Sequence, residues 1–142
     1  MRFWDSSALV PLCLNSTQTK YCLDLFKKDS HIIVWCLTLS EIWSALCRQA
    51  RDQTISDDHL QTAKKRARKL SDSWSEVVIV EKARERSLRL MEVHGLKAAD
   101  SLQLAAALIA ADEQTRQFEF VSLDKRLISA AQKEGFVIHA GA

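Results

Sequence analysis

The chain has 142 residues, of which 47% are hydrophobic, so a single domain over residues 1–142 can bury a core without cross-links. Lys and Arg number 20 against 18 Asp and Glu, and a formal net charge of +2 is too small to indicate a nucleic-acid partner by itself. Asp5 and Pro11 interrupt the first apolar stretch, which excludes a secretory signal, and no run approaches the roughly 18 apolar residues of a membrane span.

The cysteines support an intracellular location. They lie among apolar neighbours and form no C-x-x-C pair, which disfavours a zinc site or a disulfide framework. Free thiols of this kind are typical of a reducing compartment. We therefore expect a cytoplasmic protein without membrane contact, with free thiols at Cys13, Cys22, Cys36 and Cys47.

Short β-rich runs recur along the chain. Their apolar residues are nearly continuous, which is typical of strands that are buried on both faces. In chain order these predicted strands cover residues 2–4, 31–37, 76–80, 118–123 and 136–139.

Segments with helical spacing lie between these runs. Apolar stripes predict helices around residues 21–26, 39–50 and 57–72, and residues 101–111 are apolar almost all round, so that helix should be buried on several sides. Pro11 predicts a short or kinked helix after the first strand. Strands that alternate with helices imply an α/β domain with a mostly parallel sheet.

Acidic residues follow three of the predicted strands. Asp5 comes after the first strand, Glu41 after the second, and Asp124 after the run at 118–123. A fourth acid, Asp100, lies near the start of the apolar helix. Because strand-to-helix junctions of a parallel sheet share its carboxyl edge, where ligands of such folds bind, we expect the acids to meet there.

Each acid also has an ordinary structural interpretation. Asp5 and Asp124 can cap helices, and Thr38 with Glu41 matches a capping box. Asp100 can interact favourably with the positive end of a helix dipole. Taken together, four acids at one edge would repel one another unless a cation neutralised them. Oxygen ligands without His or Cys favour Mg²⁺ or Mn²⁺.

A carboxylate-bound metal ion with open positions suits phosphodiester hydrolysis. It lowers the pKa of a bound water and stabilises charge on the phosphate and the leaving oxygen. Hydroxyl groups at the same edge can support ligand carboxylates or bind phosphate, although helix capping is the commoner role of such serines. These are Ser6, Ser7, Ser40, Ser101 and Ser122.

Basic residues near the acids are candidates for substrate binding. Lys97, Lys125 and Arg126 neighbour the candidate ligands and could meet phosphates. The basic run at 64–69 spreads over several faces of a helix and is expected to be solvated, with RNA or an acidic partner as the alternative.

The tryptophans are assigned mainly to the core. Trp4 and Trp35 lie within predicted strands and Trp43 lies on an apolar helix stripe, so these three are expected to be buried. The position of Trp74 stays open, since base stacking is an alternative for any exposed tryptophan.

Four segments together resemble the PIN-domain family. "FWDSSALV" (3–10), "LSEIWSAL" (39–46), "LKAADSLQLAAAL" (96–108) and "FVSLDKRLISAAQKEGF" (120–136) have its order and approximate spacing. The short length resembles the VapC-type ribonuclease toxins within that family.

The resemblance implies a three-layer α/β/α sandwich with four or five strands and a Mg²⁺- or Mn²⁺-dependent endoribonuclease. It implies an RNA substrate, a small antitoxin partner and a homodimer. Ser6 and Ser122 would support the site, and the metal and catalytic residues would be Asp5, Glu41, Asp100 and Asp124. The alternatives are a housekeeping nuclease and a non-catalytic binding module with the same fold.

Overall fold

Five short strands form a single parallel sheet in the middle layer of the molecule. The computed structural model describes residues 1–141, and the strand order is β3-β2-β1-β4-β5. All neighbouring strands pair in parallel, so every connection crosses over through helices. The strands are β1 (Arg2–Trp4), β2 (Ile32–Trp35), β3 (Ser75–Val77), β4 (Glu119–Val121) and β5 (Val137–His139).

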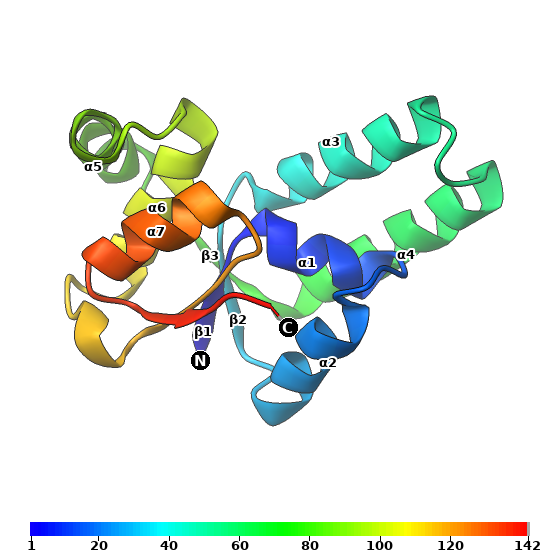
Figure 1. Cartoon of the computed structure of the whole chain (residues 1–142), viewed down its shortest axis with the longest axis horizontal. Helices are drawn as coiled ribbons and strands as arrows, with labels where there is room; N and C mark the ends of the chain where they lie inside the picture. The colour runs from blue at the N-terminus through cyan, green and yellow to red at the C-terminus, as the bar shows by residue number, and fades with distance from the viewer. Residues whose placement is uncertain (142) are drawn as a thin grey trace.

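Helices cover both faces of this sheet (Figure 1). One face carries α1 (Ser6–Cys13), α2 (Thr19–Lys28), α3 (Thr38–Arg51) and α4 (Asp57–Ser73). The other face carries α5 (Val80–His94), α6 (Ala98–Ala110) and α7 (Lys125–Lys133), and a 3₁₀ turn, Thr115–Gln117, precedes β4. The predicted α/β/α sandwich is therefore confirmed.

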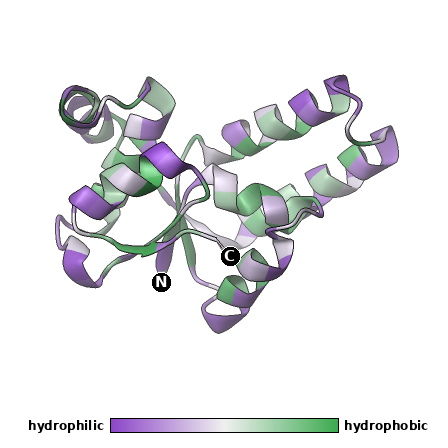
Figure 2. Cartoon of the chain, in the orientation of Figure 1, coloured by the Kyte–Doolittle hydropathy of each residue, from purple (hydrophilic) through white to green (hydrophobic). Residues whose placement is uncertain are grey.

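Successive residues of a strand pack into two different cores, one on each face of the sheet. In β1 the ring of Phe3 faces α5–α7, and its centroid stacks 5.5 Å from that of Phe120 in the neighbouring β4. The next residues along, Trp4 and Val121, belong to the core under α1–α4. Figure 2 shows this hydrophobic interior continuing through the strands and the inward sides of the helices. The central strand β1 and its neighbour β4 thus match the predicted burial on both faces.

The sheet edges depart from that prediction. β3 and β5 each have only one neighbouring strand, and both are largely exposed. The strand expected over 76–80 covers only Ser75–Val77, and Val80 already begins α5. Val78, Ile79 and Val80 are more than half exposed, since no further strand covers this edge.

The helix predictions hold closely. α6 is buried on several sides, as its apolar composition indicates, and α1 ends at Cys13, two residues after Pro11. Gly95 ends α5 in the left-handed conformation, with φ at 66°, that glycine adopts without steric cost. Among the described residues no helix has both the length and the apolar composition to cross a membrane.

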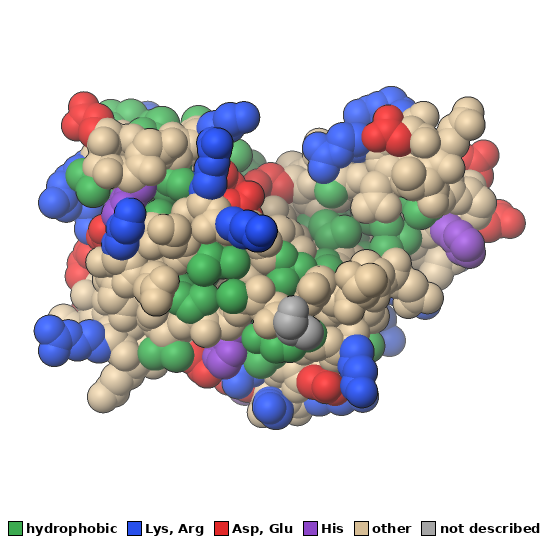
Figure 3. Space-filling model, in the orientation of Figure 1, with side chains coloured by type: hydrophobic (Ala, Val, Ile, Leu, Met, Phe, Trp, Pro, Cys, Tyr) green, Lys and Arg blue, Asp and Glu red, His purple; other side chains and the backbone are tan. Residues whose placement is uncertain are grey.

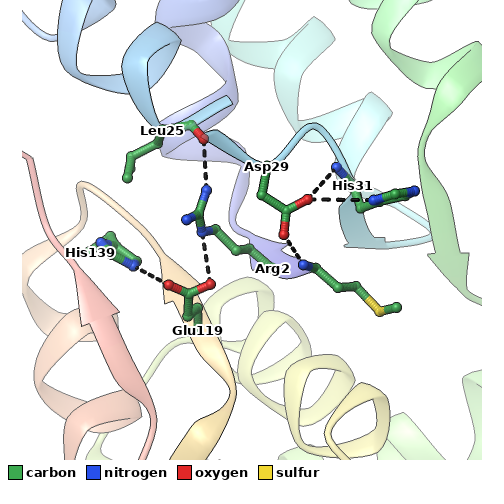
Figure 4. A network of polar contacts seen from close by, with 7 residues as sticks. Arg2, Leu25, Asp29, His31, Glu119 and His139 are labelled. Atoms are coloured by element: carbon green, nitrogen blue, oxygen red, sulfur yellow. Dashed lines mark hydrogen bonds and ion pairs between the residues drawn. The ribbon is translucent and has the colours of Figure 1, made fainter. Parts of the chain in front are cut away.

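The amino edge of the sheet is closed by an ion-pair network (Figure 4). Arg2 donates from Nε to Glu119 at 2.9 Å and from Nη1 to the carbonyl of Leu25 at 2.7 Å, and His139 Nε2 lies 2.8 Å from the same carboxylate. Burial raises the pKa of Glu119, but hydrogen bonds from His139 and Arg2 outweigh it and the net shift is downward. This network joins β1, β4, β5 and α2, and its charges are satisfied internally.

Candidate active site

The four predicted acids lie at the opposite, carboxyl edge of the sheet. Asp5 directly follows β1, Glu41 lies in the first turn of α3 after β2, and Asp124 precedes α7 after β4. Asp100 lies in the first turn of α6. Figure 3 shows acidic side chains in a notch between the α5–α7 side and the α3–α4 side, with Lys and Arg side chains on both rims.

Asp5 is held by three donors on one oxygen. Its Oδ2 accepts hydrogen bonds from the Ser7 hydroxyl, from the Ser122 hydroxyl at 3.0 Å and from the Ser7 N–H at 3.3 Å. Each hydroxyl in turn accepts from a backbone N–H, that of Leu123 on Ser7 and that of Asp124 on Ser122. Both hydroxyl hydrogens are thereby directed at Asp5, whose side chain has one fixed orientation.

A buried glutamine holds Glu41. Gln103 Nε2 donates to Glu41 Oε2 at 2.7 Å and to Thr38 Oγ1 at 3.1 Å. Gln103 and Thr38 are both fully buried, so these bonds form away from water. The contact joins α6 to α3 across the carboxyl ends of the strands.

One oxygen of each held carboxylate stays available. The Ser6 hydroxyl lies between them, 3.4 Å from Asp5 Oδ1 and 3.5 Å from Glu41 Oε1. The carboxylate of Asp100 makes no hydrogen bond or ion pair with any described residue. Three carboxylates from three elements therefore retain oxygen atoms that can accept a further ligand.

The electrostatics of the site disfavour its own negative charge. Burial, followed by repulsion from Asp5 and Asp100, raises the pKa of Glu41 to about 7. Burial and repulsion from Asp124 and Asp5 raise the pKa of Asp100 to about 6. Burial also raises the pKa of Asp5, which is only 2% exposed. A cation at this edge would relieve the repulsion.

The donor set fits a hard divalent cation in its chemistry and charge. The candidate ligands are all carboxylate oxygens, which Mg²⁺ and Mn²⁺ prefer. Within residues 1–141, however, no three His, Cys, Asp or Glu side chains lie close enough together to hold an ion as they stand. Coordination by three carboxylates therefore requires side-chain rotation, for which the unbonded Asp100 is best placed.

The structural interpretations of the acids hold in part. Asp5 and Asp124 do cap α1 and α7, accepting from the N–H groups of Ser7 and Leu127. The capping-box prediction is wrong, because Thr38 already belongs to α3 and makes its side-chain bond to Gln103. Capping and a second role of the same carboxylate are compatible, since Asp5 caps through Oδ2, while Oδ1 accepts only the long 3.4 Å bond from Ser6 among the described residues.

Some of the predicted cations and hydroxyls lie near the acids, and others do not. Lys97 precedes α6, and both Lys97 and Arg126 lower the pKa of Asp100 electrostatically, although burial outweighs them. Lys125 is exposed at the start of α7. Ser40 is exposed, and the buried Ser101 hydroxyl has no hydrogen-bond partner in the described part of the chain. Ser6, Ser7 and Ser122 are thus the hydroxyls that contact the acids.

Trp43 is only half-buried, which corrects its assignment to the core. It lines an open hollow of about 410 Å³ between α3 and α4. Lys64 Nζ and Arg68 Cζ lie 5.6 Å and 5.2 Å from its ring centroid. These two cations of the basic run share one helical face and pack on an aromatic ring. Trp74, whose position the sequence leaves open, is 9% exposed and bonds Glu76.

Sequence reasoning missed Gln103. A signal was present: Gln103 is a polar residue in an otherwise apolar helix, three residues after Asp100. Residues separated by three lie on neighbouring positions of one helical face, so Gln103 belongs to the face that carries Asp100. Its partner Glu41 lies 62 positions away, and no local pattern indicates that contact.

The fold and the positions of the acids define an α/β protein whose candidate functional edge lies at the carboxyl ends of its parallel strands. The family model for the PIN domain matches residues 2–133, and the chain belongs to the PIN-domain family. Members of this family are typically metal-dependent nucleases.

Solved structures share the fold at low sequence identity. PAE2754 from Pyrobaculum aerophilum superposes with a TM-score of 0.65 at 19% identity, covering 96% of this chain and 87% of that one. A chain of a toxin–antitoxin complex from Klebsiella pneumoniae gives a TM-score of 0.58 at 17% identity, covering 87% of each chain. No curated protein sequence matches this chain significantly.

Proposed function

We propose that this protein is a divalent-metal-dependent endoribonuclease whose metal site is built from Asp5, Glu41, Asp100 and Asp124. The observation that carries the proposal is the meeting of four carboxylates at one edge of the sheet, with the pKa of Asp5, Glu41 and Asp100 raised. A fold maintained only for binding would gain nothing from this repulsion, which lowers its stability.

Different residues of the chain would position the carboxylates, hold the metal ion and attract the substrate. Ser7 and Ser122 fix Asp5 so that Oδ1 points toward Glu41, and Gln103 fixes Glu41 so that Oε1 points toward Asp5. A divalent ion held by these oxygens supplies an activated water and stabilises charge on the phosphate. Lys97 and Arg126, on the side of Asp100, would attract the substrate phosphates.

The direct test is RNA cleavage by the purified protein. We expect cleavage of single-stranded RNA with Mg²⁺ or Mn²⁺ and none with EDTA, with a 5′-phosphate on the downstream product. Gel analysis of end-labelled RNA measures both properties. Equal cleavage in EDTA, or products that carry a 3′-phosphate, would contradict the proposed chemistry.

Gln103 is proposed as a positioning residue for Glu41. Gln103→Met keeps the approximate shape and removes the donor, so we expect Mn²⁺ affinity to fall about 10- to 100-fold. The pKa of Glu41, about 7 in the native protein, should rise further because the Gln103 hydrogen bond lowers it. Calorimetry measures the first effect and carbon NMR of the metal-free protein measures the second.

A neighbour on the same helix provides the control for this variant. Ser101 is as fully buried as Gln103, yet its hydroxyl has no hydrogen-bond partner among the described residues. Ser101→Ala should therefore leave both the Mn²⁺ affinity and the Glu41 titration unchanged. An unaltered Glu41 titration in Gln103→Met would remove the positioning role.

The finer proposal is that the protein acts as the toxin of a toxin–antitoxin pair, with a small antitoxin as partner and a homodimer as assembly. Two findings support it: the resemblance of the four acidic segments, and the fold shared with a chain of a toxin–antitoxin complex. An adjacent small reading frame that encodes a DNA-binding protein, whose product suppresses RNA cleavage, would support this role over a housekeeping nuclease.

A further inference from the structure

A polar hollow of about 520 Å³ opens between the end of α5 and the outer face of α7. Lys125, Ser129 and Lys133 follow one another at intervals of four residues, so they form a stripe along one face of α7. Over the eight residue steps from Lys125 to Lys133 the stripe extends about 12 Å. The lining residues are His94, Gly95, Lys125, Arg126, Ser129, Ala130 and Lys133.

The positive charge of this hollow is only partly neutralised by the protein, through Glu134 beside the lining His94 and through the electrostatic interaction of Arg126 with Asp100. No acidic residue lines it, and Lys125, Arg126 and Lys133 form no ion pair within residues 1–141. The acid that follows α7, Glu134, lies beside the hollow but already has partners: Nε2 of His94, which lines the hollow, lies 2.8 Å from one of its oxygens, and Arg86 Nη2 lies 3.8 Å from the other. The hollow therefore carries positive charge that can bind an anion.

The cations on the α3–α4 rim of the notch have a different environment from those of α7. There the cations of the basic run, Lys64 and Arg68, lie over the ring of Trp43 and are already engaged by an aromatic face. The cations of α7 have no comparable partner in the part of the chain that the structure describes. The stronger anion site is thus on the α7 side.

The hollow adjoins the candidate active site along the chain. Asp124 caps α7, so the stripe starts at the residue next to a proposed metal ligand. Arg126, two residues after Asp124, also lines the hollow, so it lies at the end of the stripe that is nearest the acids. A phosphate in the hollow and a phosphate at the acidic edge could therefore belong to one nucleic-acid strand.

We propose that this hollow binds the phosphodiester backbone of single-stranded RNA beside the scissile phosphate. The inference rests on the proposed function and deepens it by assigning the path of the strand along α7. Lys125, Arg126 and Lys133 supply the charge, and Ser129 supplies a hydroxyl donor. A hollow of about 520 Å³ has room for a few sugar-phosphate units of one strand.

The test is the salt dependence of RNA binding, measured by fluorescence anisotropy in EDTA so that the RNA stays intact. For Lys125→Ala/Lys133→Ala we expect affinity to fall about 10- to 100-fold at moderate salt. The plot of log affinity against log salt concentration should become less steep by about 1.4, because each phosphate of a single strand that a cation neutralises adds about 0.7 to the slope.

A charge-matched control lies at the other end of the molecule. Lys27→Ala/Lys28→Ala removes two exposed cations from the end of α2 and should leave the salt slope unchanged. If the α7 variant behaves like this control, the inference is overturned and an acidic protein segment becomes the expected ligand. A protein that binds no RNA overturns it too.

Failure of the proposed function gives a different result. A wild-type protein that binds RNA with the expected salt dependence, but does not cleave it with Mn²⁺, would overturn the nuclease proposal. The loss of affinity in the α7 variant would then still establish the phosphate site.

Discussion

Asp5→Asn is expected to reduce metal-dependent RNA cleavage on the order of 10³-fold. Three donors point at Oδ2 of Asp5, namely the Ser7 hydroxyl, the Ser7 N–H and the Ser122 hydroxyl. In the variant only the amide oxygen can accept these bonds, because an amide NH₂ group is a donor. The NH₂ group must then occupy the Oδ1 position, and it cannot bind a cation.

This loss should occur without loss of folding. Asp5 is buried and its pKa is raised, so removal of its charge relieves repulsion from Asp124 in the metal-free protein. We expect urea unfolding in EDTA to show equal or higher stability for Asp5→Asn, and calorimetry to show weakened Mn²⁺ binding. Asp24→Asn, on the exposed face of α2, is the matched control and should cleave RNA normally. Cleavage by Asp5→Asn within tenfold of wild type would contradict the role of Asp5.

Without metal, the free energy of unfolding is expected to fall by about 2 to 4 kcal/mol as the pH rises from about 4 to about 8. The pKa of Glu41 is raised to about 7 and that of Asp100 to about 6, from ordinary values near 4. The folded state therefore binds more protons than the unfolded state in this interval, so stability is lost as these groups ionise. The range allows for solvent screening at the partly exposed Asp100.

Divalent metal should reverse this loss. Mg²⁺ at millimolar concentration competes with protons for the same carboxylates, so it should stabilise the protein more at pH 8 than at pH 5. Urea unfolding with and without Mg²⁺ at both pH values measures the difference. Glu41→Gln/Asp100→Asn isolates the contribution of these two carboxylates and should show a flatter profile. Equal stabilisation by Mg²⁺ at both pH values would contradict metal binding by these acids.

Local sequence signals were sufficient for the layer order of the fold. Nearly continuous apolar runs predicted the central strands, and the all-round apolar composition of residues 101–111 predicted the burial of α6. The edge strands were less well predicted, because Val78 and Ile79 look like a buried strand in sequence and differ only in having no strand beside them. The burial of Trp43 was overestimated for a similar reason: its helix stripe is apolar, but the partly exposed ring meets the charged side chains of Lys64 and Arg68 from α4.

The sequence by itself determined that acids end the parallel strands, since strand periodicity and the residue after each strand are local properties. Asp5, Glu41 and Asp124 could be assigned to one edge for that reason. Only the tertiary structure decided which oxygens remain available. Ser122 reaches Asp5 because β4 pairs with β1, and Gln103 reaches Glu41 because α6 packs beside β2. These contacts join residues 117 and 62 positions apart, and at such separations pairing order, not local pattern, sets which side chains meet.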